Sequence, residues 1–429
     1  MAKRMFEYRI YPSVKQIKRL KTQFFLAKKL YNILLLITQD QYRANGKHMS
    51  TYDRNNVIIR IKELNPEFED CYSQVLQNIS NRIGKAYSNF FRRLRERKKG
   101  KKVKVGFPRF KKYLKTVTYP QSGFKFVSDK LFYIGKVGNV PIKKHRPTVG
   151  MVKSMSVKWT RSGKWFVVLC CETPEPPEVP TLLEQSESQG KRPEFTNAVG
   201  IDLGLEKFLA TSDNMIVENP RFLKQEGKRL RKLQRRLSRK VKASRNRRKA
   251  RLKVARQHEH IANQRKDFHW KVANELVEKY DFIGVEDLHI KKMLKDNRLA
   301  RQISDVGWGD FLRKLGHVAG SAGVPDVAVD PAGLSQNCSR CHGYVPKDLS
   351  VRVHSCPLCG LVLDRDVNSA RLILEVARRT AGHAETYACG DVASTSRSDR
   401  AQAMSMKQEL YSDASHSVNE EHPLEAHHL

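Results

Sequence analysis

The spacing of hydrophobic residues divides the first part of the chain into one strand and three helices. Residues 5–12 alternate between apolar and polar positions, as in a half-buried strand. From Val14 the apolar residues recur every three or four positions, and Gly46 is a typical helix end. Helical spacing returns over residues 53–64 and 72–97. The pattern therefore predicts a small helical domain inserted after one strand.

Short alternating segments follow this helical region. Residues 155–159 and 165–172 alternate on either side of a turn over residues 161–164, which is typical of a β-hairpin. The spacing of these segments predicts a small β-barrel to which the first strand returns. Residues 173–194 are rich in Pro, Glu and Ser, and this composition indicates a linker.

The second half begins with a buried strand over residues 199–205 that carries Asp202. The pattern then predicts, in order, a long helical stretch, a strand, a helix, a strand and a final helix over residues 220–278, 282–286, 301–320, 327–329 and 366–379. Residues 383–429 hold eight acids against three Lys or Arg and few large apolar groups, so we expect a disordered tail.

Charge indicates the class of partner. The chain has a net charge of +37, from 81 Lys and Arg against 44 Asp and Glu. Such a field attracts polyanions, so nucleic acid is the expected partner and an anionic membrane is the second choice. No apolar run approaches the roughly 18 residues that a spanning helix needs. No signal peptide precedes the first strand, and we expect a cytoplasmic protein with reduced thiols and no membrane partner.

Two segments concentrate the positive charge. Residues 92–115 contain thirteen Lys or Arg and one acid, and residues 228–256 contain sixteen and no acid. A solvated face is the usual explanation of a charge run, but unrelieved like charge destabilises a helix unless a polyanion neutralises it. The expected nucleic-acid contacts are Arg92, Arg93, Lys101, Lys102, Phe107, Arg109, Arg231, Arg235, Arg239, Arg247 and Arg251.

Two aromatic segments have alternative interpretations. Trp308 begins an apolar helical pattern that favours the core, and stacking on a base is the alternative. Residues 107–110 interleave aromatic and basic side chains, so base stacking and packing are equally compatible with them.

Four cysteines form two C-x2-C pairs separated by fourteen residues, Cys338 with Cys341 and Cys356 with Cys359. Two such pairs supply the tetrahedral four-sulfur shell that Zn²⁺ prefers, and they leave no open position for chemistry. A redox-active pair would need only one C-x2-C in a thioredoxin-like context. We therefore expect one structural zinc ion. Gly343 and Gly360 are expected to relax the tight turns, and His342 is expected at the surface.

Three acids occupy informative places: Asp202 in a strand, Glu286 at the end of another, and Asp366 before the last helix. Phosphate and carboxylate repel each other, so a phosphodiesterase site needs divalent metals that bridge them, and Mg²⁺ prefers such oxygen ligands. The residues alone do not choose between Glu286 and Asp287, or between Asp364 and Asp366. The strand around Asp202 also fits actin-like ATPases, but their further glycine-rich phosphate loops are not seen.

Six motifs occur in an order that resembles the TnpB family of transposon-encoded, RNA-guided nucleases, which is ancestral to the type V CRISPR effectors. They are Gly200-Ile-Asp-Leu-Gly, Val285-Glu-Asp-Leu, Ser304-Asp-Val-Gly-Trp-Gly, Ser335-Gln-Asn-Cys-Ser-Arg-Cys, Cys356-Pro-Leu-Cys-Gly and Asp364-Arg-Asp-Val-Asn-Ser-Ala. Tyr8-Arg-Ile-Tyr-Pro and Gly106-Phe-Pro-Arg-Phe agree less specifically, and the likeness extends to about residue 395. Leu334 and Ser369 depart from the family's usual Thr and Ala, and neither change removes a ligand.

The resemblance implies a multidomain chain of α+β and α/β type. A wedge β-barrel over residues 1–12 and 99–180 is interrupted by a helical recognition lobe over 13–98. A linker over 181–196 leads to a RuvC-like, RNase H-type nuclease domain, which is interrupted by a zinc ribbon and followed by the tail. These last three parts are expected over residues 197–332 with 364–382, 333–363 and 383–429.

The resemblance also implies an activity. Asp202, Glu286 and Asp366 are the expected catalytic acids and would hold Mg²⁺, two ions, for which Mn²⁺ substitutes. A monomeric ribonucleoprotein would carry a guide RNA from its transposon's end and recognise a short motif beside the target. It would bind double-stranded and single-stranded DNA and cut it in one RuvC site. Because all three acids are present, we expect an active enzyme. The alternatives are a non-cleaving nucleic-acid-binding regulator and a transposase proper.

Overall fold

The computed structural model describes residues 2–46, 48–173, 195–296, 298–348 and 351–381. The chain divides into two compact units between residues 175 and 176. The expected tail lies outside the described residues, as does the expected linker apart from residues 195 and 196. Within the described ranges, no helix is both long enough and apolar enough to cross a membrane.

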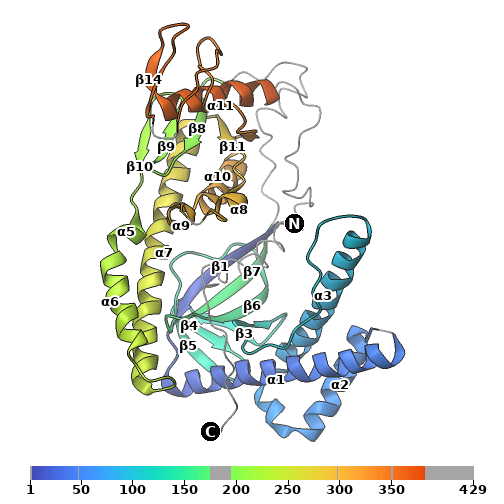
Figure 1. Ribbon diagram of the computed structural model, residues 1–429. Coiled ribbons are helices and arrows are strands. Elements are labelled where there is room, and N and C mark those ends of the chain that lie inside the picture. Colours follow the sequence, from blue (N-terminus) through green and yellow to red (C-terminus); the bar gives the residue numbers. More distant parts are fainter. Residues whose placement is uncertain (1, 47, 174–194, 297, 349–350, 382–429) are drawn as a thin grey trace. The chain divides into compact units, whose positions relative to one another are not determined.

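The N-terminal unit is an antiparallel sheet with helices inserted after its first strand (Figure 1). Its strands are β1 (Ala2–Ile10), β2 (Thr116–Tyr119), β3 (Phe124–Ser128), β4 (Leu131–Ile134), β5 (Gly138–Lys143), β6 (Met151–Trp159) and β7 (Trp165–Thr173). Its helices are α1 (Val14–Asn45), α2 (Thr51–Leu64), the 3-10 helix η1 (Pro66–Asp70) and α3 (Ser73–Lys98). The predicted insertion of three helices after one strand is confirmed.

The first strand returns to the later ones, as the sequence predicts. β1 pairs with β7 from Ala2 to Ile10 and with β5 at its end. The strand order is β2-β6-β7-β1-β5-β4-β3, so β2 and β3 are the edges of the seven-stranded sheet. A closed barrel therefore stays a prediction.

Local capping sets the bounds of the first two helices. Ser13 and Gln16 form a reciprocal capping box at the start of α1, and Gly46 ends it in the left-handed conformation. Ser50 and Asp53 form a second capping box at the start of α2. Polar residues before an apolar repeat thus mark these helix starts in the sequence itself.

The C-terminal unit contains a five-stranded sheet in the order β10-β9-β8-β11-β12. Its strands are β8 (Ala198–Leu203), β9 (Lys207–Thr211), β10 (Ile216–Glu218), β11 (Phe282–Glu286) and β12 (Asp326–Val329), with a separate hairpin of β13 (Val353–Ser355) and β14 (Val362–Asp364). β8, β11 and β12 are parallel neighbours, whereas β9 and β10 are antiparallel. The helices are α5 (Phe222–Gln225), α6 (Gly227–Ser238), α7 (Arg245–Lys279), α8 (Ile290–Met293), α9 (Ala300–Val306), α10 (Trp308–Ala322) and α11 (Arg365–Ala381).

Helices cover both faces of this sheet. One core cluster joins Val199 and Ile201 of β8 to Leu276 of α7 and Phe311 of α10. On the other face, Phe282 of β11 packs with residues of α11. Trp308 is buried in the first cluster, which confirms its interpretation as a core residue.

Two predicted helices are each broken in the structure. The stretch over 220–278 is α5, α6 and α7, and α6 packs against α7 as a hairpin (Figure 1). Ala243 adopts a left-handed φ of 65°, Ser244 caps α7, and Arg247 donates to the carbonyls of Leu237 and Lys240. These bonds satisfy groups that a continuous helix would have paired internally.

The helix predicted over 301–320 is α9 and α10. Gly307, with a φ of 70°, ends the first and immediately precedes the second. A glycine inside an apolar repeat is the signal that marks this break.

Two glycines let α11 lie directly on the sheet. Gly200 of β8 and Gly284 of β11 are paired in the parallel register. A Cβ at Gly200 would lie 2.0 Å from the carbonyl oxygen of Ala370, and one at Gly284 would lie 2.8 Å from the Cβ of Ala377. Neither strand therefore tolerates a side chain here without moving α11.

Gly200→Ala is expected to destabilise the C-terminal unit by at least about 2 kcal/mol, because the new methyl group overlaps backbone atoms of α11. Gly320→Ala in α10 is the matched control. A Cβ there meets nothing within 4 Å, so the change should stabilise by about 0.5–1 kcal/mol. Urea unfolding of both variants measures the difference. Equal stability of the two would contradict the close approach of α11.

Candidate functional site

The three predicted catalytic acids lie at one edge of the C-terminal sheet. Val285 pairs with Ile201 in the parallel register, so the next residues, Glu286 and Asp202, lie side by side where β11 and β8 end. Each acid follows a glycine that faces α11 by two residues, so both acids lie on the α11 side of the sheet. Asp366 lies in the first turn of α11, and a Cβ at Gly204 would lie 3.9 Å from its Oδ2. The structure thus brings the three acids together.

Burial and neighbouring charges raise the pKa values of these acids. Burial, and then the charges of Glu286 and Asp366, raise the pKa of Asp202 well above its ordinary value. Burial raises the pKa of Glu286 to about 7. Burial and the neighbouring charge of Asp364 raise the pKa of Asp366. Crowded, half-buried carboxyls of this kind are stable as anions only beside a cation.

The acids that the sequence left as alternatives have other surroundings. Burial works against ionisation of Asp364, but hydrogen bonds from Lys207 Nζ and from the backbone N–H of Asp366 outweigh it, and the pKa is lowered. Asp364 thus stabilises the start of α11. Asp287 is exposed, and its backbone N–H pairs with Val329.

The two candidate metal sites differ in their donors. The ligand atoms of the four cysteines of the two C-x2-C pairs all lie within 4.8 Å of one another. The three carboxyls offer oxygen donors of the type that Mg²⁺ and Mn²⁺ prefer.

The cysteines fit a zinc ribbon. The Sγ atoms of Cys338 and Cys359 are 3.6 Å apart, as are those of Cys341 and Cys356. A tetrahedral four-sulfur shell with Zn–S bonds of about 2.3 Å has edges of about 3.8 Å. The side-chain geometry therefore matches the ion that the spacing predicts.

Each pair is followed by a residue in the left-handed conformation. In the second knuckle this residue is Gly360, with a φ of 70°, as predicted. In the first it is His342, with a φ of 57°, so the prediction for Gly343 was wrong. Gly343 has a different role, because a Cβ there would lie 2.3 Å from Leu358 of the other knuckle. The exposed His342 side chain pairs with Glu375 of α11 and is not a ligand.

Asn368, for which the sequence predicted no role, ties the ribbon to α11. Its side chain is fully buried. It accepts from the Ser339 N–H at 2.9 Å and donates to the Asn337 carbonyl at 2.8 Å. Asn368 lies two residues after Asp366, so the first knuckle is held beside the acids. Its place within the last motif was the available signal.

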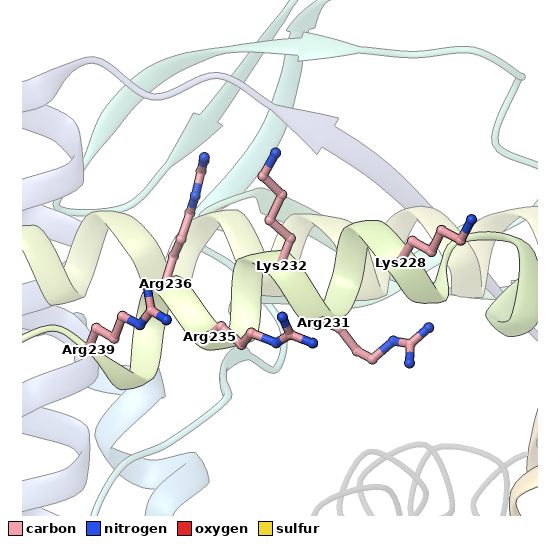
Figure 2. A pocket seen from close by; sticks show the side chains of 6 residues that line it. All are labelled: Lys228, Arg231, Lys232, Arg235, Arg236 and Arg239. Atoms are coloured by element: carbon pink, nitrogen blue, oxygen red, sulfur yellow. The ribbon is translucent and has the colours of Figure 1, made fainter.

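In the basic hairpin of α6 and α7, residues of α6 and its C-cap line a hollow with cations alone (Figure 2). Figure 2 shows Lys232 and Arg236 pointing to one side of α6 and Arg231 and Arg235 to another, as their spacing of four requires. The lining residues are Lys228, Arg231, Lys232, Arg235, Arg236 and Arg239. Three of the predicted contacts, Arg231, Arg235 and Arg239, thus share one surface.

The other predicted contacts differ in how free they are. Arg251 on α7 is exposed, whereas Arg247 is occupied in closing the hairpin. Arg92 on α3 pairs with Glu96, and Arg93 is exposed. Lys101, Lys102 and Arg109 are exposed in the loop after α3, where Phe107 contacts two rings of that helix.

Comparison with known families agrees with this arrangement. Residues 169–297 match the family described as "Probable transposase", and residues 308–373 match "Cas12f1-like, TNB domain". Residues 1–47 match a family described as "Helix-turn-helix domain", although in this chain they form β1 and α1. The first match contains Asp202 and Glu286, and the second contains the four cysteines and Asp366.

Relatives that are similar over nearly the whole chain identify the family. The "Putative RNA-guided DNA endonuclease" of Streptomyces pristinaespiralis is 32% identical over 95% of this chain and 96% of its own. This chain belongs to the TnpB family. The "Putative RNA-guided DNA endonuclease InsQ" of Escherichia coli is 29% identical over 91% of this chain and 95% of its own.

A solved structure agrees with this TnpB fold. The mini-RNA-guided endonuclease CRISPR-Cas phi3 matches with a TM-score of 0.52 and 10% identity, over 88% of this chain and 92% of that one. The predicted fold class of a multidomain α+β chain is confirmed at this level.

Glu286→Gln is expected to stabilise this TnpB protein at pH 8 in the absence of added divalent ions. Below the unfolded pKa near 4.5 the glutamate is neutral in both states. Between that value and about 7 the folded state retains a proton that the unfolded state releases, so the free energy of unfolding falls as pH rises. The variant avoids this loss, which is on the order of 3 kcal/mol.

Urea titrations from pH 4 to 8 measure this effect, with Asp287→Asn as the control. The wild-type and control curves should fall with pH, and the Glu286→Gln curve should fall less. Parallel curves for all three proteins would show that burial in the folded site does not raise the pKa of the Glu286 carboxyl.

Cys356→Ser is expected to remove zinc and to unfold the ribbon, whose small core consists of Cys338, Val345 and Cys356. Zinc content measured by mass spectrometry should fall from about one ion per chain to near zero. Cys170→Ser, a half-buried position on β7, is the control and should keep its zinc. Zinc retention by both variants would contradict the four-sulfur site.

Proposed function

We propose that this protein is an RNA-guided, divalent-metal-dependent DNA endonuclease encoded by a transposable element. The observation that carries the proposal is the convergence of Asp202, Glu286 and Asp366 at one sheet edge. Burial raises the pKa of all three, and the charges of Glu286 and Asp366 raise that of Asp202 further. Three carboxyls that disfavour their own ionisation make a poor structural cluster and a good metal site. Membership of the TnpB family and the names of its relatives support DNA as the substrate.

The acids would hold two Mg²⁺ ions, for which Mn²⁺ substitutes. When bound, the ions would activate water and stabilise the leaving oxygen of the phosphodiester. Asp202 and Glu286 would orient this site from the rigid ends of two parallel strands. Asp366 would complete it from α11, whose start Asp364 stabilises and whose position Asn368 ties to the ribbon.

The basic surfaces would bind the nucleic acids. The α6–α7 hairpin offers Arg231, Arg235 and Arg239 on one face, with a charge that only a polyanion neutralises. Cations of this kind contact phosphates and carry no sequence information. Specificity would therefore come from base pairing by a guide RNA made from the transposon's end, and from a short motif read beside the target. We propose a monomeric ribonucleoprotein that cuts DNA in a single RuvC-like, RNase H-type site.

The domain plan follows from the same proposal. Residues 1–12 with 99–180 would form the wedge barrel, and residues 13–98 the recognition lobe. Residues 197–332 with 364–382 would form the nuclease domain around the zinc ribbon of residues 333–363.

Asp202→Asn is expected to lower DNA cleavage by roughly 1,000-fold or more, because a neutral amide binds a divalent ion poorly at the most buried acid. The assay sequences the RNA that copurifies with the protein, then cleaves a plasmid library carrying the matching target in Mg²⁺. Asp287→Asn, the exposed neighbour of Glu286, is the control and should cut as the wild type does.

A second readout does not depend on cleavage. Mg²⁺ should raise the Tm of the wild type and of Asp287→Asn more than that of Asp202→Asn. Full cleavage by Asp202→Asn would refute the catalytic assignment. Absence of a discrete copurifying RNA would refute guiding, and binding without cleavage by the wild type would favour the regulator.

A further inference from the structure

The basic loop after α3, residues 101–115, contains no helix or strand. Hydrogen bonds and ring contacts nevertheless hold it against the helices of the N-terminal unit. Asn32 of α1 donates to the Lys111 carbonyl at 3.1 Å and accepts from the Lys111 N–H at 2.8 Å. Gln39, two turns further along α1, donates to the Pro108 carbonyl at 3.4 Å. The backbone over 108–111 therefore runs along α1 in one conformation.

Side chains from the loop reinforce this attachment. The Phe107 ring meets Phe90 at 4.9 Å and Tyr87 at 5.5 Å, edge to face in both cases. Leu114 packs against the core. The Lys111 ammonium lies 5.8 Å from the ring centre of Tyr31. Phe107 is 39% exposed, but its two ring contacts with α3 make it an anchor of the loop.

Two other rings of the loop are free. Phe110 is 52% exposed and Tyr113 is 57% exposed. Neither contacts another ring within the part of the chain that the structure describes. Covering an exposed aromatic ring with a flat partner buries apolar surface, which is favourable. A ring on a fixed backbone also loses little conformational entropy when it is covered.

Cations flank these rings and have no acidic partners among the described residues. Lys102 and Lys104 are exposed and alternate with the half-buried Val103 and Val105, so the ammonium groups share the outer side. Arg109 and Lys112 are also exposed. Arg109 immediately precedes Phe110 in the sequence, and Lys112 immediately precedes Tyr113. A fixed row of cations with intervening free rings matches a chain of phosphates with intervening bases.

We propose that Phe110 and Tyr113 form a stacking platform for unpaired nucleotides of a single-stranded nucleic acid, with Asn32 as the residue that positions it. The proposal rests on the nucleic-acid function above and adds to it a specific site and class of ligand. Bases stack on the two rings, while Arg109 and Lys112 contact the adjoining phosphates. Phe107, predicted from the sequence as a nucleic-acid contact, is instead proposed to anchor the loop through Tyr87 and Phe90.

The test uses the full chain cleared of copurifying RNA at high salt, with a labelled oligouridylate and an abasic chain of equal length as probes. The double change Phe110→Ala and Tyr113→Ala should weaken oligouridylate binding roughly 10-fold or more. Binding of the abasic chain should not change, because the phosphate contacts remain. Lys112→Ala should instead lower the salt slope for both probes by about 0.7.

Two further variants separate positioning from general damage. Asn32→Ala should lose the oligouridylate preference without a fall in Tm, because it releases the loop and removes no core contact. Phe25→Ala on α1, equally 52% exposed, is the control and should bind as the wild type does. Crosslinking of a 4-thiouridine probe should map to Phe110 or Tyr113.

The outcomes decide between distinct conclusions. Unchanged oligouridylate affinity in the double variant, or an equal loss for both probes, would overturn the platform. Crosslinks confined to the α6–α7 hairpin would also overturn it. A wild type that binds the probes as expected but does not cleave DNA would refute the nuclease proposal. The platform would stand, because its probes measure binding only.

Discussion

The close approach of α11 to β8 and β11 is the constraint on which the proposed nuclease site depends. Gly200 and Gly284 remove the side chains that would keep the helix away, and α11 crosses the sheet in contact with its backbone. The first turn of the helix then reaches the strand ends, where Asp202 and Glu286 lie. Without this contact Asp366 would lie too far from Asp202 to raise its pKa. Two residues without side chains thus determine how three carboxyls meet.

The same helix links the acids to the zinc ribbon. Asn368 binds the backbone of the first knuckle, and His342 of that knuckle pairs with Glu375. The four sulfurs close a shell with no open position, so the ribbon contributes order and no chemistry. A zinc ion that folds the knuckles would thereby also restrain the start of α11. The four cysteines and the three proposed catalytic carboxyls are thus separate sites joined through one helix.

Basic charge serves two architectures in this TnpB protein. In the α6–α7 hairpin the cations lie on regular helices, at spacings set by the helical repeat. In the loop over 101–115 the backbone has no repeat, and side chains of α1 supply its order through Asn32 and Gln39. Both present exposed cations, such as Arg235 on α6 and Arg109 in the loop, which are the groups that contact the phosphates of a polyanion. Only the loop adds free aromatic rings to the charge.

The sequence by itself determined the elements and the chemistry available to them. Apolar periodicity predicted the inserted helices, and C-x2-C spacing predicted the four-sulfur site, because both depend on local geometry. The order of motifs indicated the TnpB family. Only the tertiary structure showed the physical difference between Asp364 and Asp366, broke the helix at Ala243, and distinguished Phe107 from Phe110. Each of these depends on which distant group lies nearby: Lys207 beside Asp364, Arg247 folded back on α6, and Phe90 against Phe107. Contacts between residues far apart in the chain leave no periodicity, so no pattern in the sequence records them.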